Sequence, residues 1–462
     1  MKTTKISGGT VVTASDHFVA DVYVRDGRIV GMGAELGIGA DEEVDARGCY
    51  VLPGGVDPHV HLDYPSLDTY TADDSHSGTA AAAHGGTTTI INFAVQQNGE
   101  ELLQTLYRSL ALAEGNAVTD YAFHVVVREL PERCLDWIDG LVKEGVTSIK
   151  VFMAYPGEFM IDDGTLLRIL EQTGEASALT MIHAENGGAI DVLTGRALAA
   201  GRTSPRWHGK TRPTLLEAEA VHRASVLAEL ADARAYFVHL SCEEAVAELT
   251  QARARGVAVY GETCPHYLTL DDSVYDNDSF DVARYVMTPP LRAPHQPASL
   301  WRAIARGDVD VVSTDHCPFC MVGQKDAGRD NFLKIPNGVG GVEYRLLLLF
   351  DRGVAAGQVS LERLVAITAT NPAKLFGLYP SKGVLAVGSD ADIVILDPRS
   401  TTTLSNRKSA SKVDYSIYEG WTVQGAIHKV FVRGEEVVSG GRLVTTDRRG
   451  RYISRGPSLG LL

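Results

Sequence analysis

The middle of the chain alternates short apolar runs with longer stretches rich in Ala, Leu and Glu. The apolar runs have the length and composition of buried strands, and the stretches between them are typical of helices. Eight strands with helical connections predict a parallel (β/α)8 barrel, the TIM-barrel fold, while a doubly wound open sheet would give a similar local pattern. The predicted strands cover residues 51–57, 87–93, 121–127, 148–153, 179–183, 235–240, 257–262 and 309–314.

The two ends of the chain show a different pattern, in which apolar and polar residues alternate over short runs, as in 21–24 and 429–438. Such alternation is typical of antiparallel strands and hairpins. We therefore predict one small β-sandwich domain built from both ends, with the barrel inserted between them. The expected domains are residues 1–52 plus 375–440 for the β-sandwich, 53–374 for the barrel and 441–462 for a C-terminal tail, which is either a loose end or an arm to a neighbouring subunit.

Composition narrows the class of protein. The 58 acidic and 43 basic residues give a net charge of −15, which disfavours nucleic acid or an anionic membrane as a partner. No apolar run reaches the roughly 18 residues of a membrane span, and the N-terminus lacks the apolar core of a signal peptide. Six cysteines in 462 residues are too few for a disulfide scaffold and fit a reducing compartment. Together these features predict a cytoplasmic protein.

Side chains with metal-binding atoms interrupt or follow five of the predicted strands. The first strand is followed by two histidines two residues apart, which on an extended chain point to the same face. The C-terminal ends of barrel strands share one face, so the groups on the other strands are expected there too. A single histidine is as often an ordinary core residue, but the recurrence predicts a metal site. The candidate ligands are His59, His61, Lys150, His183, His239 and Asp315.

Lys150 is the informative member of this set. An ammonium group in an apolar strand beside metal ions would be desolvated and repelled, so a neutral or chemically altered lysine is expected. Carbamylation by CO2 would turn Lys150 into N6-carboxylysine, a carboxylate able to bridge two metal ions. The alternative is a lysine whose amine reaches the rim of the barrel.

The ligand types indicate which ions the site would hold. Nitrogen and oxygen ligands suit Zn²⁺ first, with manganese, iron or cobalt as alternatives. Two divalent ions about 3.5 to 4 Å apart form the two-metal arrangement for hydrolysis. In that arrangement Asp315 would both bind metal and carry a proton to the leaving nitrogen.

With these residues in place, the chain resembles the amidohydrolase superfamily and, within it, the hydantoinase and dihydropyrimidinase group of cyclic amidases. The resemblance covers almost the whole chain and matches all six metal-ligand positions of the family. The motifs that carry it include Gly54-Gly55-Val56-Asp57-Pro58-His59-Val60-His61, Lys150-Val151-Phe152-Met153-Ala154-Tyr155, His183-Ala184-Glu185-Asn186-Gly187, Gly261-Glu262-Thr263-Cys264-Pro265-His266, Ser313-Thr314-Asp315-His316 and Ile335-Pro336-Asn337-Gly338.

The resemblance implies a homotetramer with a binuclear zinc centre bridged by carboxylated Lys150, which opens a cyclic ureide or imide to an N-carbamoyl amino acid. It also implies that Tyr155 stabilises the developing oxyanion, as a preorganised phenol donor can. The ring would be held through backbone groups at Thr288, where the family has serine, and at Asn337. A substituent on the ring is expected against apolar loops that contain Leu62, Tyr64, Leu67, Phe152 and Phe159.

Three alternatives remain beside this interpretation. Dihydroorotase resembles the chain in its metal ligands, but it calls for an arginine where this sequence has Asp63, which would repel a substrate carboxylate. Allantoinase is possible because allantoin is itself a substituted hydantoin. A non-catalytic scaffold related to this fold would have lost metal ligands, whereas all six are present here.

Overall fold

Eight parallel strands from the middle of the chain form one sheet in the order β6-β9-β10-β11-β12-β13-β14-β15. Nearly all of their residues are buried, because helices cover one side of the sheet and the strands' own side chains fill the other. The strands are β6 (Gly55–Val60), β9 (Thr87–Val95), β10 (Asp120–Val126), β11 (Ser148–Phe152), β12 (Leu179–His183), β13 (Ala235–Phe237), β14 (Val259–Thr263) and β15 (Val311–Val312).

The first and last of these strands meet and close the sheet into a barrel. The His61 N–H donates to the His316 carbonyl at 2.8 Å, and Val60 and His316 form a parallel bridge. Deeper in the barrel, Nη1 of Arg345 donates to the carbonyls of Val56 at 3.0 Å and Val312 at 3.2 Å. The predicted (β/α)8 barrel is therefore confirmed, and the open-sheet alternative is excluded.

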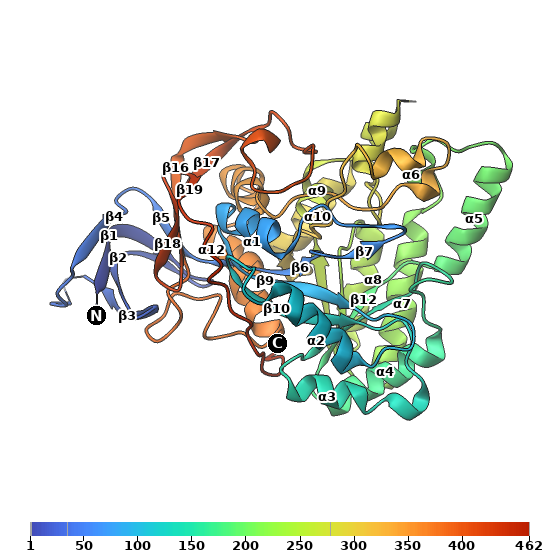
Figure 1. Ribbon diagram of the computed structural model, residues 1–462, viewed down its shortest axis with the longest axis horizontal. Helices are drawn as coiled ribbons and strands as arrows, with labels where there is room; N and C mark the ends of the chain where they lie inside the picture. The colour runs from blue at the N-terminus through green and yellow to red at the C-terminus, as the bar shows by residue number, and fades with distance from the viewer. Residues whose placement is uncertain (1, 35, 278, 462) are drawn as a thin grey trace.

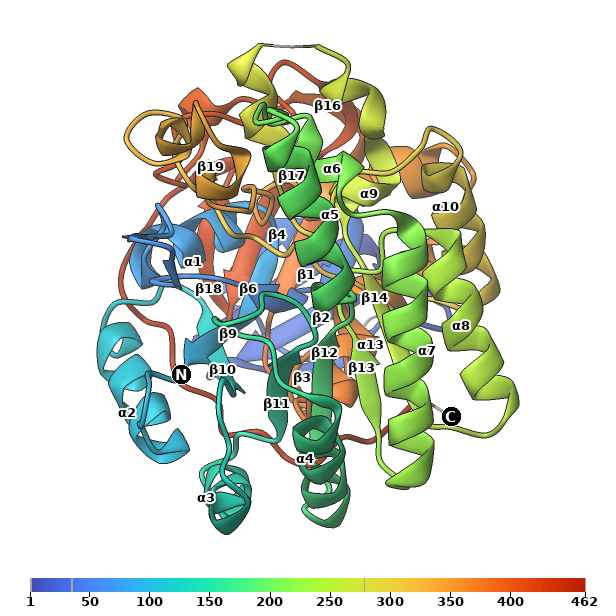
Figure 2. The same ribbon diagram turned by 90° about the vertical axis from the view of Figure 1, so that its right-hand side faces the viewer.

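The structure is a computed structural model that describes residues 2–34, 36–277 and 279–461. Figure 2 shows helices arranged around strands β9 to β14. In α4 the buried residues Leu166, Ile169 and Leu170 recur at helical spacing, so one stripe of the helix faces the strands. The helices are α1 (Ser75–His84), α2 (Leu102–Ala113), α3 (Trp137–Lys143), α4 (Asp163–Glu175), α5 (Gly187–Ala199), α6 (Trp207–Lys210), α7 (Thr214–Leu230), α8 (Glu243–Ala254), α9 (Pro265–Thr269), α10 (Gln296–Arg306), α11 (Arg345–Leu349), α12 (Leu361–Val365) and α13 (Asn371–Leu375).

The two chain ends form a second domain, at the left of Figure 1. Its strands make one continuous sheet in the order β19-β18-β17-β16-β5-β1-β2-β3, with β4 beside β1. Antiparallel pairing of β5 with β16 joins the two ends, as expected. The strands are β1 (Thr3–Val12), β2 (His17–Arg25), β3 (Arg28–Gly33), β4 (Glu42–Asp45), β5 (Tyr50–Pro53), β16 (Ile393–Thr403), β17 (Thr422–Val432), β18 (Glu435–Ser439) and β19 (Arg442–Leu443).

The apolar run predicted as one strand over 51–57 is divided between the two domains. Residues Tyr50–Pro53 belong to β5 of the terminal sheet, and the first barrel strand begins only at Gly55. Gly54 lies between them, and a Cβ there would fall 2.1 Å from Oγ1 of Thr88. The chain therefore passes from one sheet to the other at a position that only glycine can occupy.

The C-terminal tail is not a loose end, because it forms part of the floor of its own barrel. The Tyr121 N–H donates to the Arg451 carbonyl at 3.0 Å, and the Ile453 N–H donates to the Tyr121 carbonyl at 2.8 Å. Farther along, the Arg455 N–H donates to the Gly145 carbonyl at 3.0 Å. These contacts lie at or before the starts of β10 and β11, on the face opposite the strand ends that carry the candidate site.

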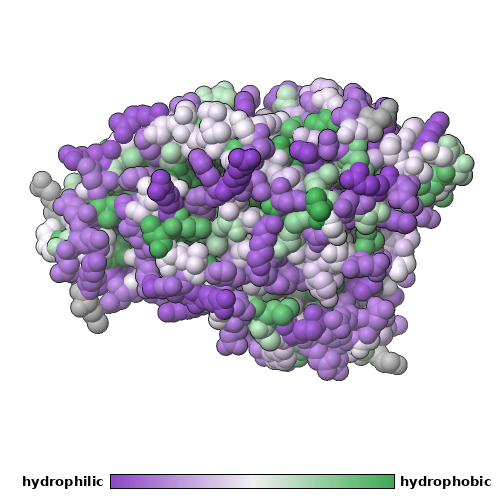
Figure 3. All heavy atoms as spheres, turned by 45° about the horizontal axis from the view of Figure 1, so that its top comes forward, coloured by the Kyte–Doolittle hydropathy of each residue, from purple (hydrophilic) through white to green (hydrophobic). Residues whose placement is uncertain are grey.

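The surface in Figure 3 is mostly hydrophilic, with apolar side chains in small separate groups. Among the described residues, no helix has both the length and the apolar character needed to cross a membrane.

Candidate metal centre

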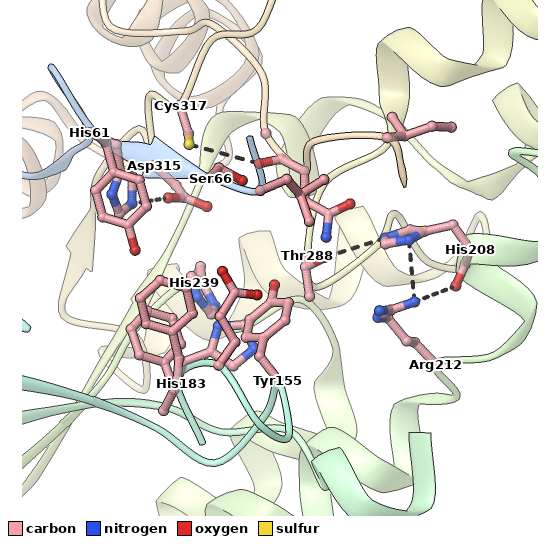
Figure 4. Close-up of a pocket in the computed structure, with 18 of the residues that line it drawn as sticks. His61, Ser66, Tyr155, His183, His208, Arg212, His239, Thr288, Asp315 and Cys317 are labelled. Atoms are coloured by element: carbon pink, nitrogen blue, oxygen red, sulfur yellow. Dashed lines mark hydrogen bonds and ion pairs between the residues drawn. The ribbon is translucent and has the colours of Figure 1, made fainter. Parts of the chain in front are cut away.

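A cavity of about 200 Å³ opens at the C-terminal ends of the barrel strands (Figure 4). The strands bring to its wall side chains that are up to 256 positions apart in the sequence. All six predicted ligands line this cavity, namely His59, His61, Lys150, His183, His239 and Asp315. The expectation that they share one face of the barrel is therefore met.

His59, His61 and Asp315 form the tightest group. Oδ1 of Asp315 lies 3.1 Å from Nε2 of His59 and 3.0 Å from Nε2 of His61. One potential ligand atom from each of the three lies within 4.8 Å of the others, a spacing that one ion can span. Nδ1 of His61 is buried without a hydrogen-bond partner among the described residues. A metal ion fits this donor set.

His183 and His239 continue the group across the cavity. Their rings are 4.6 Å apart between centroids, and the His239 ring is 5.5 Å from that of His59. Lys150 lines the same cavity and is only 1% exposed, with Nζ 5.4 Å from the Phe93 ring and 4.9 Å from the Phe152 ring. Burial lowers the pKa of the Lys150 amine to about 7, so the neutral form is readily available.

Two buried carboxylates hold the histidines in place, and the sequence analysis assigned neither of them a role. Oε1 of Glu262 lies 2.6 Å from Nδ1 of His59 and accepts from the His239 backbone N–H at 3.1 Å. Oε2 of Glu185 lies 2.8 Å from Nε2 of His183. A carboxylate on one ring nitrogen fixes the orientation of the other nitrogen toward a metal. Their position within the Gly-Glu-Thr and His-Ala-Glu motifs was the only signal in the sequence.

Four cavity residues have a left-handed backbone conformation that non-glycine residues rarely adopt, and three of them follow barrel strands. The φ angles are 67° at Tyr155, 41° at His239 and 47° at Asp315. Each costs on the order of 1–3 kcal/mol, so the surrounding structure must enforce it. All three lie just beyond a barrel strand, where the chain turns sharply beside the cavity.

The predicted substrate contacts Tyr155, Thr288 and Asn337 also line the cavity. Burial raises the pKa of the Tyr155 phenol, so the hydroxyl stays protonated and can donate a hydrogen bond.

Nη1 of Arg212 lies 3.2 Å from Nδ1 of His208, and both side chains reach the cavity (Figure 4). Neither residue could be predicted from the sequence, because both lie outside the strand-end pattern.

The comparison with known families agrees with this geometry. A model of the amidohydrolase family matches residues 50–437, which include every candidate ligand. The chain belongs to the amidohydrolase family. This amidohydrolase is 48% identical to the D-hydantoinase of Streptomyces coelicolor over 98% of both chains. It is 46% identical to the D-hydantoinase of Geobacillus stearothermophilus, over 97% of this chain and 96% of that one.

Solved structures show the same fold. The dihydropyrimidinase from Brevibacillus agri NCHU1002 superposes with a TM-score of 0.97 at 45% identity, over 98% of this chain and 99% of that chain. The L-hydantoinase (dihydropyrimidinase) from Arthrobacter aurescens is more distant, with a TM-score of 0.89 at 30% identity, over 98% of this chain and 100% of that chain.

The apolar wall of the amidohydrolase cavity differs from expectation at two positions. Tyr64, Leu67, Phe152 and Phe159 line the cavity, but Leu62 does not and packs against Gly78 of α1 instead. Asp63 also turns away, and its Oδ2 accepts from the Ser75 N–H at 2.9 Å and from the Ser75 hydroxyl at 2.8 Å. Asp63 therefore interacts with the start of α1 and does not line the cavity.

Proposed function

We propose that this amidohydrolase opens the ring of hydantoins and dihydropyrimidines by hydrolysing a cyclic amide bond, which yields N-carbamoyl amino acids. The observation that carries the proposal is the gathering of four histidines, Lys150 and Asp315 around one cavity at the strand ends. The full-length similarity to D-hydantoinases supports the same reaction for this chain.

The proposed centre holds two divalent metal ions, Zn²⁺ first, with the six cavity residues as ligands and Lys150 carboxylated by CO2. The close grouping of His59, His61 and Asp315 and the buried amine of Lys150 support this assignment. When bound, such a pair of ions polarises a carbonyl group and lowers the pKa of water, which permits hydrolysis at neutral pH.

The reaction adds the oxygen of water to a ring carbonyl carbon and breaks the adjacent carbon–nitrogen bond. In the proposed mechanism the Asp315 carboxylate accepts a proton from the attacking water and delivers it to the leaving nitrogen. The neutral Tyr155 phenol donates a hydrogen bond to the carbonyl oxygen as negative charge grows there. Backbone groups of Thr288 and Asn337 hold the ring in position relative to Asp315 and Tyr155.

We further propose a preference for D-5-substituted hydantoins. Tyr64, Leu67, Phe152 and Phe159 form an apolar wall that can accept an aromatic or alkyl substituent. The relatives at 46–48% identity are named D-hydantoinases, whereas the L-hydantoinase structure has 30% identity. We also propose that the protein is cytoplasmic and forms a homotetramer. Light scattering of the purified protein would test the homotetramer.

The test is a kinetic panel on protein with a measured metal content. The panel contains hydantoin, both enantiomers of 5-phenylhydantoin, dihydrouracil, allantoin and dihydroorotate. We expect ring opening of hydantoin, dihydrouracil and D-5-phenylhydantoin, with kcat/KM for the D enantiomer above that for the L enantiomer. Faster turnover of dihydroorotate or allantoin, or no ring opening by metal-replete protein, would contradict the proposal.

A further inference from the structure

Lys325 is a lysine buried inside the wall of the cavity, at the start of the 3₁₀ turn Lys325–Gly328. Its side chain is fully buried, and its Nζ donates to the carbonyls of Val286 and Pro336, each at 3.0 Å. Within the described parts of the chain it forms no ion pair with a carboxylate. None of the mechanistic steps above uses this residue.

The two carbonyls belong to the two segments that are proposed to hold the ring. Val286 lies two positions before Thr288, and Pro336 directly precedes Asn337. The same Val286 carbonyl also accepts from the Gly338 N–H at 3.0 Å. One amine therefore joins segments that lie 50 positions apart in the sequence, at the point where both reach the cavity.

The lysine is itself held firmly. Its backbone N–H donates to the Cys320 carbonyl at 2.9 Å. At the other end of the turn Gly328 packs so tightly on Ile335 that a Cβ would lie 2.2 Å from Cγ1. The backbone of the turn that carries Lys325 is thus fixed beside the segment that contains Pro336.

The number of hydrogen-bond acceptors around Lys325 matches the number of donors on a neutral amine. A neutral amine has two N–H donors, and two carbonyl acceptors are present. Burial lowers the pKa of Lys325 to about 7, which favours that neutral form. Around it, Ala283, Val286, Phe332 and Ile335 form an apolar cluster. An apolar side chain would suit this cluster better, but it would leave the Pro336 carbonyl without this donor and the Val286 carbonyl with only the Gly338 N–H.

We infer that Lys325 is a positioning residue, which sets the backbone positions of Thr288 and Asn337 so that both contact the substrate ring. This inference rests on the proposed function, because it assumes a ring held by these two segments. Contacts made through the backbone cannot adjust by rotating a side chain, so their spacing must be set by the surrounding structure. A displacement of about 1 Å at such a site can cost roughly 100-fold in rate.

The test compares Lys325→Met, which removes both donors, with Lys325→Gln, whose carboxamide restores two N–H groups. The control is Lys334→Met, an exposed lysine in the same part of the chain. We expect Lys325→Met to raise KM for hydantoin roughly 10- to 100-fold, with a smaller change in kcat and an unchanged metal content. Lys325→Gln should recover part of the loss, and Lys334→Met should match the parent protein.

Hydrogen exchange of the segments 284–291 and 335–341 provides a readout that needs no turnover. Loss of the two hydrogen bonds should speed exchange of the Gly338 amide in Lys325→Met and leave it unchanged in Lys334→Met. Unchanged exchange, or faster exchange with unchanged KM, would overturn the inference. If Lys325→Met does not fold, the same two measurements on Lys325→Leu, which also lacks both donors, decide. A metal-replete parent protein that opens no cyclic ureide would overturn the proposed function, and hydrogen exchange would then still support or overturn the link through Lys325.

Discussion

At the scale of single residues, the environment of Lys150 disfavours the charged form of its amine. The amine is buried between the Phe93 and Phe152 rings, and among the described residues it has neither a hydrogen bond nor an ion pair. Such a position is unfavourable for an ammonium group, because burial removes water and no hydrogen bond replaces it. A neutral amine can add to CO2, and the resulting carboxylate would suit cations held by the neighbouring histidines.

Lys150→Ala should therefore lose bound metal and ring-opening activity together. Small carboxylates such as acetate or propionate should restore part of both, because they can occupy the space of the missing carbamate. The measurement is metal content by mass spectrometry alongside turnover, with Lys143→Ala, an exposed lysine at the end of α3, as the control. Retention of full metal stoichiometry and turnover in Lys150→Ala would exclude the bridging role.

Tyr155→Phe tests the proposed oxyanion contact. The phenol is protonated because burial raises its pKa, and removal of one preorganised donor lowers turnover by roughly 10- to 1000-fold. Metal content should remain that of the parent protein, since the phenol is not among the proposed ligands. The measurement is kcat for hydantoin with metal content determined on the same sample. An unchanged kcat would give Tyr155 a packing role only.

The residues that the sequence revealed and those it did not differ in one physical respect. His183 and Asp315 stand out because each ends an apolar strand, where a polar side chain is conspicuous. Glu262 and Lys325 contact residues that are far from them in the sequence. Glu262, for example, pairs with His59, which is 203 positions away. Such contacts depend on the three-dimensional arrangement of the strands, so periodicity along the chain cannot show them.

At the scale of secondary-structure elements, closure of the barrel depends on the junction between β6 and β15. β6 contains His59 and is followed by His61, and β15 leads to Asp315, so this junction sets the spacing of the tightest group of candidate ligands. The guanidinium of Arg345 joins the two strands and also donates to Oγ1 of Thr87 at 3.0 Å. The eight strands could be predicted from their apolar runs, but this junction could not, because Arg345 lies in a helix after the last strand.

Arg345→Met should destabilise the barrel and weaken metal binding at the same time. The substitution leaves the Val56 and Val312 carbonyls without this donor and removes the cation 3.9 Å from the buried Asp57 carboxylate. Loss of one partner from a buried charged group costs about 3–5 kcal/mol. The measurements are the thermal midpoint and the metal content, with exposed Arg352→Met as the control. A variant with the parent's thermal midpoint and full metal would show that the strands close without Arg345.

At the scale of the whole molecule, the two ends of the chain support the barrel from outside the site. The terminal sheet could be predicted from alternation at both ends, but the path of the tail could not. Its contacts with Tyr121 and Gly145 are backbone hydrogen bonds, which leave no pattern of side chains in the sequence. No described residue of the terminal sheet or the tail lines the cavity, so we expect them to contribute to stability rather than to the chemistry.

A buried ionic cluster joins the terminal domain to the barrel. Nζ of Lys382 lies 2.6 Å from Asp120, 3.1 Å from Asp390 and 2.8 Å from Asp392, and Arg433 also pairs with Asp120. Asp120 begins β10 of the barrel, whereas Asp392 directly precedes β16 of the terminal sheet. The 1% exposed Lys382 therefore neutralises carboxylates from both domains at once.

Lys382→Met should lower the free energy of unfolding by about 3–5 kcal/mol, because three buried or partly buried carboxylates would lose their shared cation. The control is Lys2→Met, which breaks an exposed pair with Glu42 and should leave the thermal midpoint unchanged. Metal content and kcat below the melting transition should stay at the parent level, since the cluster lies away from the cavity.

Denaturant and thermal unfolding measure the change in the free energy of unfolding, and an unchanged midpoint would show that the domains hold together without this cluster. A loss of bound metal in otherwise folded Lys382→Met would instead show that the junction between the domains also sets the geometry of the metal centre.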